Sequence, residues 1–89
     1  LPGRFSLRQN YPNPFNPLTR ITYTLAQAKQ VKLVVYDLLG REVTTLVDDV
    51  ETAGTKSVRF DAGNLPSGVY FYRLEAGNFV DVKKMLLMR

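Results

Sequence analysis

Acidic side chains that could bind a cation or take part in acid–base catalysis are concentrated in one short stretch. Asp48, Asp49 and Glu51 lie within a few positions of one another. A hard cation such as Ca²⁺ needs more oxygen ligands than these carboxylates supply, in a loop with a defined spacing that is absent here. A glycosidase pair would need a cleft between two carboxylates, which so small a domain seldom builds. We therefore expect the tip of a solvated hairpin and no metal site.

The residue types that carry most nucleophile and base chemistry are missing. The 89 residues contain no cysteine and no histidine. This excludes Cys–His and Ser–His–Asp catalytic groups, disulfides, and metal sites that depend on Cys or His. Gly54-Thr55-Lys56-Ser57 looks like the end of a phosphate-binding loop, but the upstream glycine is absent and the following residues have a strand pattern. We predict a protein that is not an enzyme and that binds no cofactor.

The charge is mildly basic and dispersed. Twelve Lys and Arg residues against eight Asp and Glu residues give a net charge of +4. Nucleic-acid binding would need a basic stripe with exposed aromatic residues, and only the C-terminus, with Lys83, Lys84 and Arg89, has cations without neighbouring acids. No apolar run is long enough to be a transmembrane segment, and no signal peptide is visible. Because Leu1 is not an initiator methionine, we expect a piece of a longer protein.

The aromatic residues admit two interpretations. The chain has five tyrosines and five phenylalanines but no tryptophan. Their ordinary role is to fill the core of a small domain. Tyr11, Phe15 and Tyr36 could instead form a platform on which a sugar stacks, and the exposure of their rings distinguishes the two possibilities.

A proline-rich stretch opens the chain. Residues 10–17 read NYPNPFNP. Proline has a fixed φ and no amide donor, so this stretch is neither a helix nor a central strand. Because Tyr11 and Phe15 alternate with the prolines, we expect it to dock on the domain rather than act as a flexible linker. We predict an entry segment over residues 1–17 and a sandwich over residues 18–89, within a single domain.

From Arg20 onward, apolar and polar residues alternate with the period of a β-strand. The number and spacing of these strands, with no helix between them, predict an all-β fold: an immunoglobulin-like antiparallel sandwich of about seven strands with Greek-key connections. We predict strands over residues 20–25, 31–37, 41–48, 55–61, 69–76 and 79–88, a loop over 26–29 and a polar turn over 49–54.

Three local patterns specify turns. Residues 37–40, Asp-Leu-Leu-Gly, predict a hairpin turn with a positive φ at Gly40, and Gly77-Asn78 predicts a two-residue hairpin. Tyr70 follows Gly68 at a strand entrance, as in the tyrosine corner of Greek-key sandwiches, where the hydroxyl group bonds to upstream backbone. We expect these residues to have structural roles: Tyr11, Pro12, Pro14, Gly40 and Tyr70.

The last strand is unusual, because residues 83–89, KKMLLMR, place four consecutive apolar residues between cations. One interpretation is a central strand buried on both faces. The other is a terminal strand that presents backbone and apolar side chains to a partner, with the lysines facing an acidic surface. An apolar edge strand could also cause weak self-association.

Four ordered stretches resemble the type A C-terminal sorting domain of proteins exported by the bacterial type IX (Por) secretion system. A related immunoglobulin-like module of the flagellar hook-capping scaffold is similar over residues 36–43 and 68–70. The YPNP opening and the lysine-led last strand favour the sorting family. The four stretches are 9–17 (QNYPNPFNP), 35–43 (VYDLLGREV), 65–74 (LPSGVYFYRL) and 83–85 (KKM).

The resemblance implies a non-catalytic module that directs a secreted cargo, the N-terminal domain of the same chain, from the periplasm of a Gram-negative bacterium across the outer membrane to the cell surface. It implies the secretion machinery and a sortase-like peptidase as partners. The alternative is a carbohydrate-binding or spacer module of an extracellular enzyme. We expect the cations to attract the machinery and Met85 and Leu87 to supply apolar burial. The residues expected to contact the machinery are Gly68, Val69, Tyr70, Lys83, Lys84, Met85, Leu87 and Arg89.

Overall fold

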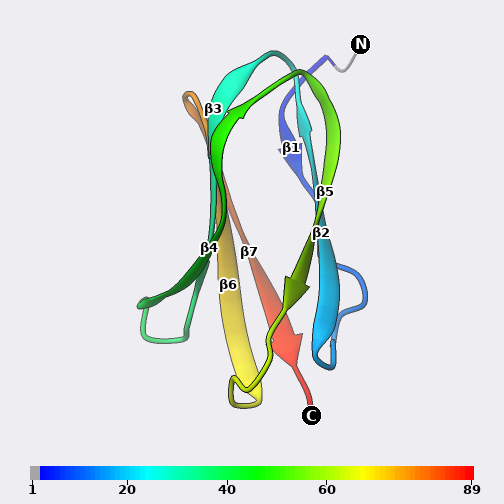
Figure 1. The fold of residues 1–89 in the computed structure, drawn as a ribbon, viewed down its shortest axis with the longest axis vertical. Helices are drawn as coiled ribbons and strands as arrows, with labels where there is room; N and C mark the ends of the chain where they lie inside the picture. Colours follow the sequence, from blue (N-terminus) through cyan, green and yellow to red (C-terminus); the bar gives the residue numbers. More distant parts are fainter. Residues whose placement is uncertain (1–2) are drawn as a thin grey trace.

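Residues 3–89, which a computed structural model describes, form β-strands arranged in two layers (Figure 1). The alternation of apolar and polar residues that predicted strands produces them, and the chain adds one short strand before the proline-rich stretch. The strands are β1 (Ser6–Leu7), β2 (Leu18–Leu25), β3 (Lys29–Tyr36), β4 (Glu42–Glu51), β5 (Gly54–Asp61), β6 (Gly68–Ala76) and β7 (Phe79–Leu87).

All the strand pairs are antiparallel. One sheet has the order β1-β2-β5 and the other the order β4-β3-β6-β7. The chain crosses between the sheets after β2, after β4 and after β5, which gives the Greek-key connections of an immunoglobulin-like sandwich. The predicted all-β fold of about seven strands is confirmed. Within residues 3–89 there is no helix with the length and apolarity to cross a membrane.

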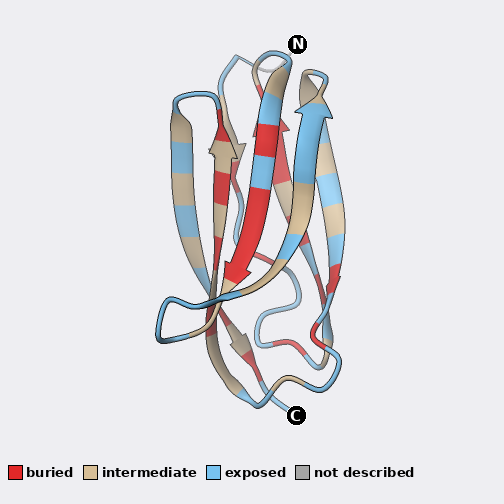
Figure 2. Cartoon of the chain, turned by 60° about the vertical axis from the view of Figure 1, so that its left-hand side comes forward, coloured by how far each residue is buried: buried red, intermediate tan, exposed pale blue. Residues whose placement is uncertain are grey.

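The two sheets enclose one hydrophobic core, and buried residues alternate with exposed ones along the strands (Figure 2). Alternation places one side of each strand in the core, where each fully buried large aliphatic or aromatic side chain stabilises the fold by roughly 1.5–3 kcal/mol. The largest fully buried side chains are Tyr23, Tyr72, Phe15, Ile21, Leu25, Leu33, Leu74, Met85, Leu87, Val31, Val34 and Val35.

The predicted polar turn over residues 49–54 is wrong, because β4 continues to Glu51. Asp49 pairs with Val31, and Glu51 pairs with Lys29, so ladder pairing with β3 overrides the polar composition. The carboxylates therefore lie along an edge strand rather than at a hairpin tip. Among the described residues, no group of three or more Asp and Glu side chains is placed to hold a metal ion.

β7 is the second edge of the four-stranded sheet. The interpretation of the last strand as a central strand buried on both faces is therefore wrong. Its inner side chains, Met85 and Leu87, lie in the core, whereas Val80 and Val82 on the outer face are half exposed. The two-residue hairpin at Gly77-Asn78 that joins β6 to β7 is confirmed, because Ala76 pairs with Phe79.

Candidate functional site

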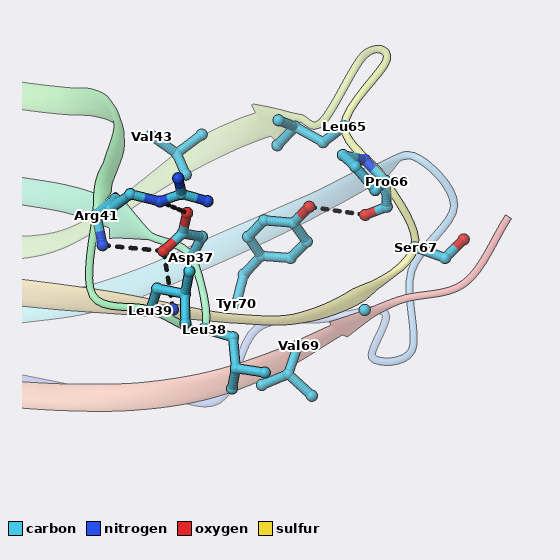
Figure 3. Close-up of a pocket in the computed structure, with 11 residues that line it drawn as sticks. Asp37, Leu38, Leu39, Arg41, Val43, Leu65, Pro66, Ser67, Val69 and Tyr70 are labelled. Atoms are coloured by element: carbon cyan, nitrogen blue, oxygen red, sulfur yellow. Dashed lines mark hydrogen bonds and ion pairs between the residues drawn. The ribbon is translucent and has the colours of Figure 1, made fainter.

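The stretches singled out in the sequence lie toward the same end of the sandwich. Figure 1 shows the β3–β4 turn, the β5–β6 loop and the C-terminus near one another at the end opposite the N-terminus. The turn and the loop line a common groove with a volume of about 390 Å³ (Figure 3). The C-terminal residue bonds to the loop, and the proline-rich stretch bonds to the last strand. Segments far apart in the sequence thus build one surface.

The β3–β4 turn is held by the carboxylate of Asp37. This carboxylate accepts hydrogen bonds from the amides of Leu39 and Arg41, each at 2.9 Å, and from the Arg41 Nε at 2.7 Å (Figure 3). The amide of Arg41, and then its guanidinium group, lower the pKa of Asp37 below its ordinary value. The predicted positive φ of Gly40 is confirmed at 82°. The turn therefore holds Leu38 and Leu39 rigidly in solvent, with 67% and 76% of their surfaces exposed.

The other wall of the groove begins with the predicted tyrosine corner, which is confirmed. The hydroxyl group of Tyr70 donates a hydrogen bond to the Pro66 carbonyl oxygen at 2.7 Å. Gly68 has a φ of 147°, a conformation that residues with a Cβ atom rarely adopt. Val69 follows it on the outer side of the sheet and faces the groove together with Leu38 and Leu39 (Figure 3). The corner thus fixes the position at which β6 enters the sheet.

Arg89 is tied to the β5–β6 loop. Its Nε donates to the Leu65 carbonyl oxygen at 2.8 Å, and its amide donates to the Ser67 Oγ at 3.2 Å. The guanidinium group also donates to the Gly63 carbonyl oxygen. The C-terminal cation therefore binds carbonyl groups of its own chain, which limits its availability for an acidic partner.

A proline-rich clasp, which we define as residues 9–15, covers the end of the β7 edge. Phe15 makes a parallel bridge to Leu87, and its ring is only 2% exposed. The clasp saturates the outward main-chain groups of β7 that an added strand would use. The four hydrogen bonds are Phe15 N to Leu86 O (2.9 Å), Met88 N to Phe15 O (3.0 Å), Leu86 N to Asn13 Oδ1 (3.0 Å) and Gln9 Nε2 to Lys84 O (2.7 Å).

A buried polar network anchors the clasp at Asn10. The amide of Asn10 donates to the Tyr72 hydroxyl at 2.8 Å, and that hydroxyl donates to the Arg8 carbonyl oxygen at 2.7 Å. Burial raises the pKa of Tyr72 to about 12. The Asn10 side chain and the Thr19 hydroxyl both donate to the Pro12 carbonyl oxygen. The sequence pattern assigns no role to this network, because its partners lie on strands far apart along the chain.

The aromatic platform for a sugar is wrong as predicted. Phe15 lies in the core, 6.0 Å from Phe60 between ring centroids, while 81% of the Tyr11 surface is exposed. Tyr11 pairs through its backbone with Arg20 of the three-stranded sheet, whereas Tyr36 belongs to the four-stranded sheet. The three rings therefore do not share one face.

The residues predicted to contact the machinery are divided among three environments. Gly68 and Val69 line the groove, and the buried ring of Tyr70 supports it. Met85 and Leu87 are enclosed in the core, so in the folded domain their side chains pack internally. The adjacent lysines lie on opposite faces of β7, because side chains alternate along a strand. Lys83 is on the face shared with Met85, 4.0 Å from an Asp81 carboxylate oxygen, and Lys84 is on the outer face.

These features define an immunoglobulin-like sandwich whose distinctive motifs meet where its last strand ends. The family model described as "Secretion system C-terminal sorting domain" matches residues 9–88. The chain therefore belongs to the C-terminal sorting domains of type IX secretion, and the family predicted from its four stretches is confirmed. It is a sorting signal for that system. The chain matches no curated protein and no solved structure.

Proposed function

We propose that this domain is a non-catalytic signal that directs a cargo domain of the same chain across the outer membrane to the surface of a Gram-negative bacterium. Membership of the sorting family over residues 9–88 is the observation that carries this proposal. The partners are the outer-membrane export machinery and a sortase-like peptidase that removes the domain. Recognition takes place on the folded domain, because unrelated cargoes can share one signal only if it folds independently of them.

The geometry of the motif-bearing end supports recognition of a folded surface. The Asp37 carboxylate, the Tyr70 hydroxyl and the Arg89 side chain each fix a loop of this end through hydrogen bonds to backbone. A surface ordered before binding loses less conformational entropy when a partner docks. The rigid exposure of Leu38 and Leu39 supplies apolar area for that contact.

An export assay tests the proposal. A periplasmic reporter is fused to the N-terminus of the domain and expressed in a bacterium that has a type IX secretion system. We expect the reporter outside the outer membrane, and we expect it in the periplasm when the domain is omitted or the translocon gene is deleted. Retention of the intact, folded fusion in the periplasm of the competent strain would contradict the proposal.

Truncations in this assay need care because the last strand serves the core. Deleting residues 84–89 would remove Met85 and Leu87, both fully enclosed, and would unfold the domain as well as remove a signal. Point substitutions on the surface separate the two effects. Their folding is checked by circular dichroism and by thermal unfolding.

A further inference from the structure

The outer face of the four-stranded sheet carries an apolar cluster beside a cation. The strand register places Phe71 directly between Tyr36 on β3 and Lys84 on β7, and it places Val69 opposite Leu86. The opposite phase of β6 and β7 fills the core, so these five side chains share the solvent side of the sheet. We name them the outer patch: Tyr36, Val69, Phe71, Lys84 and Leu86.

The outer patch continues into the groove. Val69 belongs to both, and across the groove lie the exposed Leu38 and Leu39 (Figure 3). Monomeric proteins rarely expose a contiguous apolar surface of this kind unless it binds something. Because the turn and the tyrosine corner hold its two sides, the surface is ordered before any partner arrives.

The charges on this face differ between its two halves. Toward the β6–β7 hairpin, Lys32 lies between Asp48 and Glu75 in the strand register, and Arg73 pairs with Glu75 at 3.2 Å. Within residues 3–89, no carboxylate lies within ion-pairing distance of Lys84. The patch therefore combines apolar area with an unneutralised cation.

The nearest acidic residue along the patch rows does not change this. Glu42 is opposite Tyr36 on β4, at the far edge of the sheet. It is three strand spacings, about 14 Å, from the position of Lys84. The charge that complements the patch must therefore come from a partner.

The edge of β7 is closed to strand addition, which leaves the face for recognition. The clasp occupies the main-chain groups from Lys84 to Met88. Farther along, the Asp81 carboxylate accepts a hydrogen bond from the Val82 amide at 2.8 Å, and Asp81 and Lys83 point inward. Inward charges on an edge strand discourage pairing with another chain. Side chains on the outer face are thus more accessible than backbone on the edge.

We propose that the outer patch is the surface through which the export machinery docks, and that it fits an apolar partner surface with a carboxylate opposite Lys84. This inference depends on the proposed function. Charge complementarity at Lys84 selects an acidic partner site, while Val69, Phe71 and Leu86 supply the apolar contact. A membrane surface or a sugar would not need this combination of a carboxylate and aliphatic contacts.

Two matched pairs of substitutions test the outer patch in the reporter export assay. Lys84→Gln and Lys83→Gln remove the same charge from adjacent residues on opposite faces. Val69→Thr and Val80→Thr make the same nearly isosteric change on the outer face, inside and outside the patch. We expect the export rate to fall about fivefold or more for Lys84→Gln and Val69→Thr, and to stay within about twofold for Lys83→Gln and Val80→Thr.

The possible outcomes are distinguishable. Equal export of all four variants would overturn the outer patch while leaving the proposed function intact. An equal loss for Lys83→Gln and Lys84→Gln would also overturn it, because recognition would then not depend on the face. If even the unaltered fusion stays in the periplasm, the proposed function itself fails. Thermal unfolding of the purified variants identifies any loss that comes from misfolding, and Leu86→Gln then replaces the variant concerned.

Discussion

The two ends of the sandwich are closed by different kinds of contact. At one end, residues 52–53 and 77–78 join neighbouring strands through tight turns. At the other, hydrogen bonds connect the beginning of the chain to its end: Gln9 to Lys84, and Asn13 to Leu86. The first end is closed locally and the second by long-range contacts. The domain therefore completes its motif-bearing end only when both termini are in place, which suits a signal that is recognised folded.

The clasp provides the most demanding test of this comparison. Phe15→Ala removes a ring from the core and should lower the free energy of unfolding by about 3–5 kcal/mol. Tyr11→Ala, in the same stretch, removes a ring that is mostly exposed and should change it by less than about 0.5 kcal/mol. Urea denaturation followed by circular dichroism measures both. Similar losses for the two variants would show that the clasp is held by its backbone and not by Phe15.

Two tyrosines on β6 sharpen the comparison, because one serves a local contact and the other a long-range one. Tyr70→Phe loses a bond to Pro66 and should cost about 1 kcal/mol. Tyr72→Phe deprives both the Asn10 amide and the Arg8 carbonyl of a buried partner, so it should cost about 2–3 kcal/mol. Denaturation of the two variants side by side is the measurement. A larger loss for Tyr70→Phe would reverse the importance assigned to the two contacts.

The ranking of local and long-range contacts also describes what the sequence could predict. The turn at residues 37–40, the hairpin at 77–78 and the corner at Tyr70 were within reach because each depends on a few adjacent residues. The end of β4 was not, because Asp49 and Glu51 have turn-like side chains and only their pairing with β3 makes them a strand.

The last strand shows a second limit of prediction. Four consecutive apolar residues leave the phase of the alternation undetermined. The core contacts of Met85 and Leu87 fix it, and they thereby direct Lys83 and Lys84 to opposite faces. The partner of the proline-rich stretch was equally hidden, since Leu86 is more than seventy residues from Asn13.

The clasp should also control association of the β7 edge. Replacing both Gln9 and Asn13 with alanine frees the Lys84 carbonyl and the Leu86 amide for pairing with a second copy. We expect weak dimers at high concentration in sedimentation experiments, with unfolding free energy reduced by about 1–2 kcal/mol. Asn16→Ala is the control, because the Asn16 side chain has no hydrogen-bond partner among residues 3–89 and should leave a monomer. Dimers of the unaltered domain at equal concentration would show that the clasp does not protect the edge.

The smallest effect is expected at the β3–β4 turn, whose hydrogen bonds are local and exposed. Asp37→Ala should speed hydrogen exchange at the amides of Leu39 and Arg41 several-fold while exchange in the core strands stays the same. The pKa of Asp37 is lowered in the folded state, so the contribution of its carboxylate is present above the unfolded pKa and disappears as the pH falls through the folded value, below about 3.8. Exchange of these amides near neutral pH, compared between the variant and the unaltered domain, measures this directly. Unchanged protection of both amides would mean that the sheet, and not the Asp37 carboxylate, orders the turn that exposes Leu38 and Leu39.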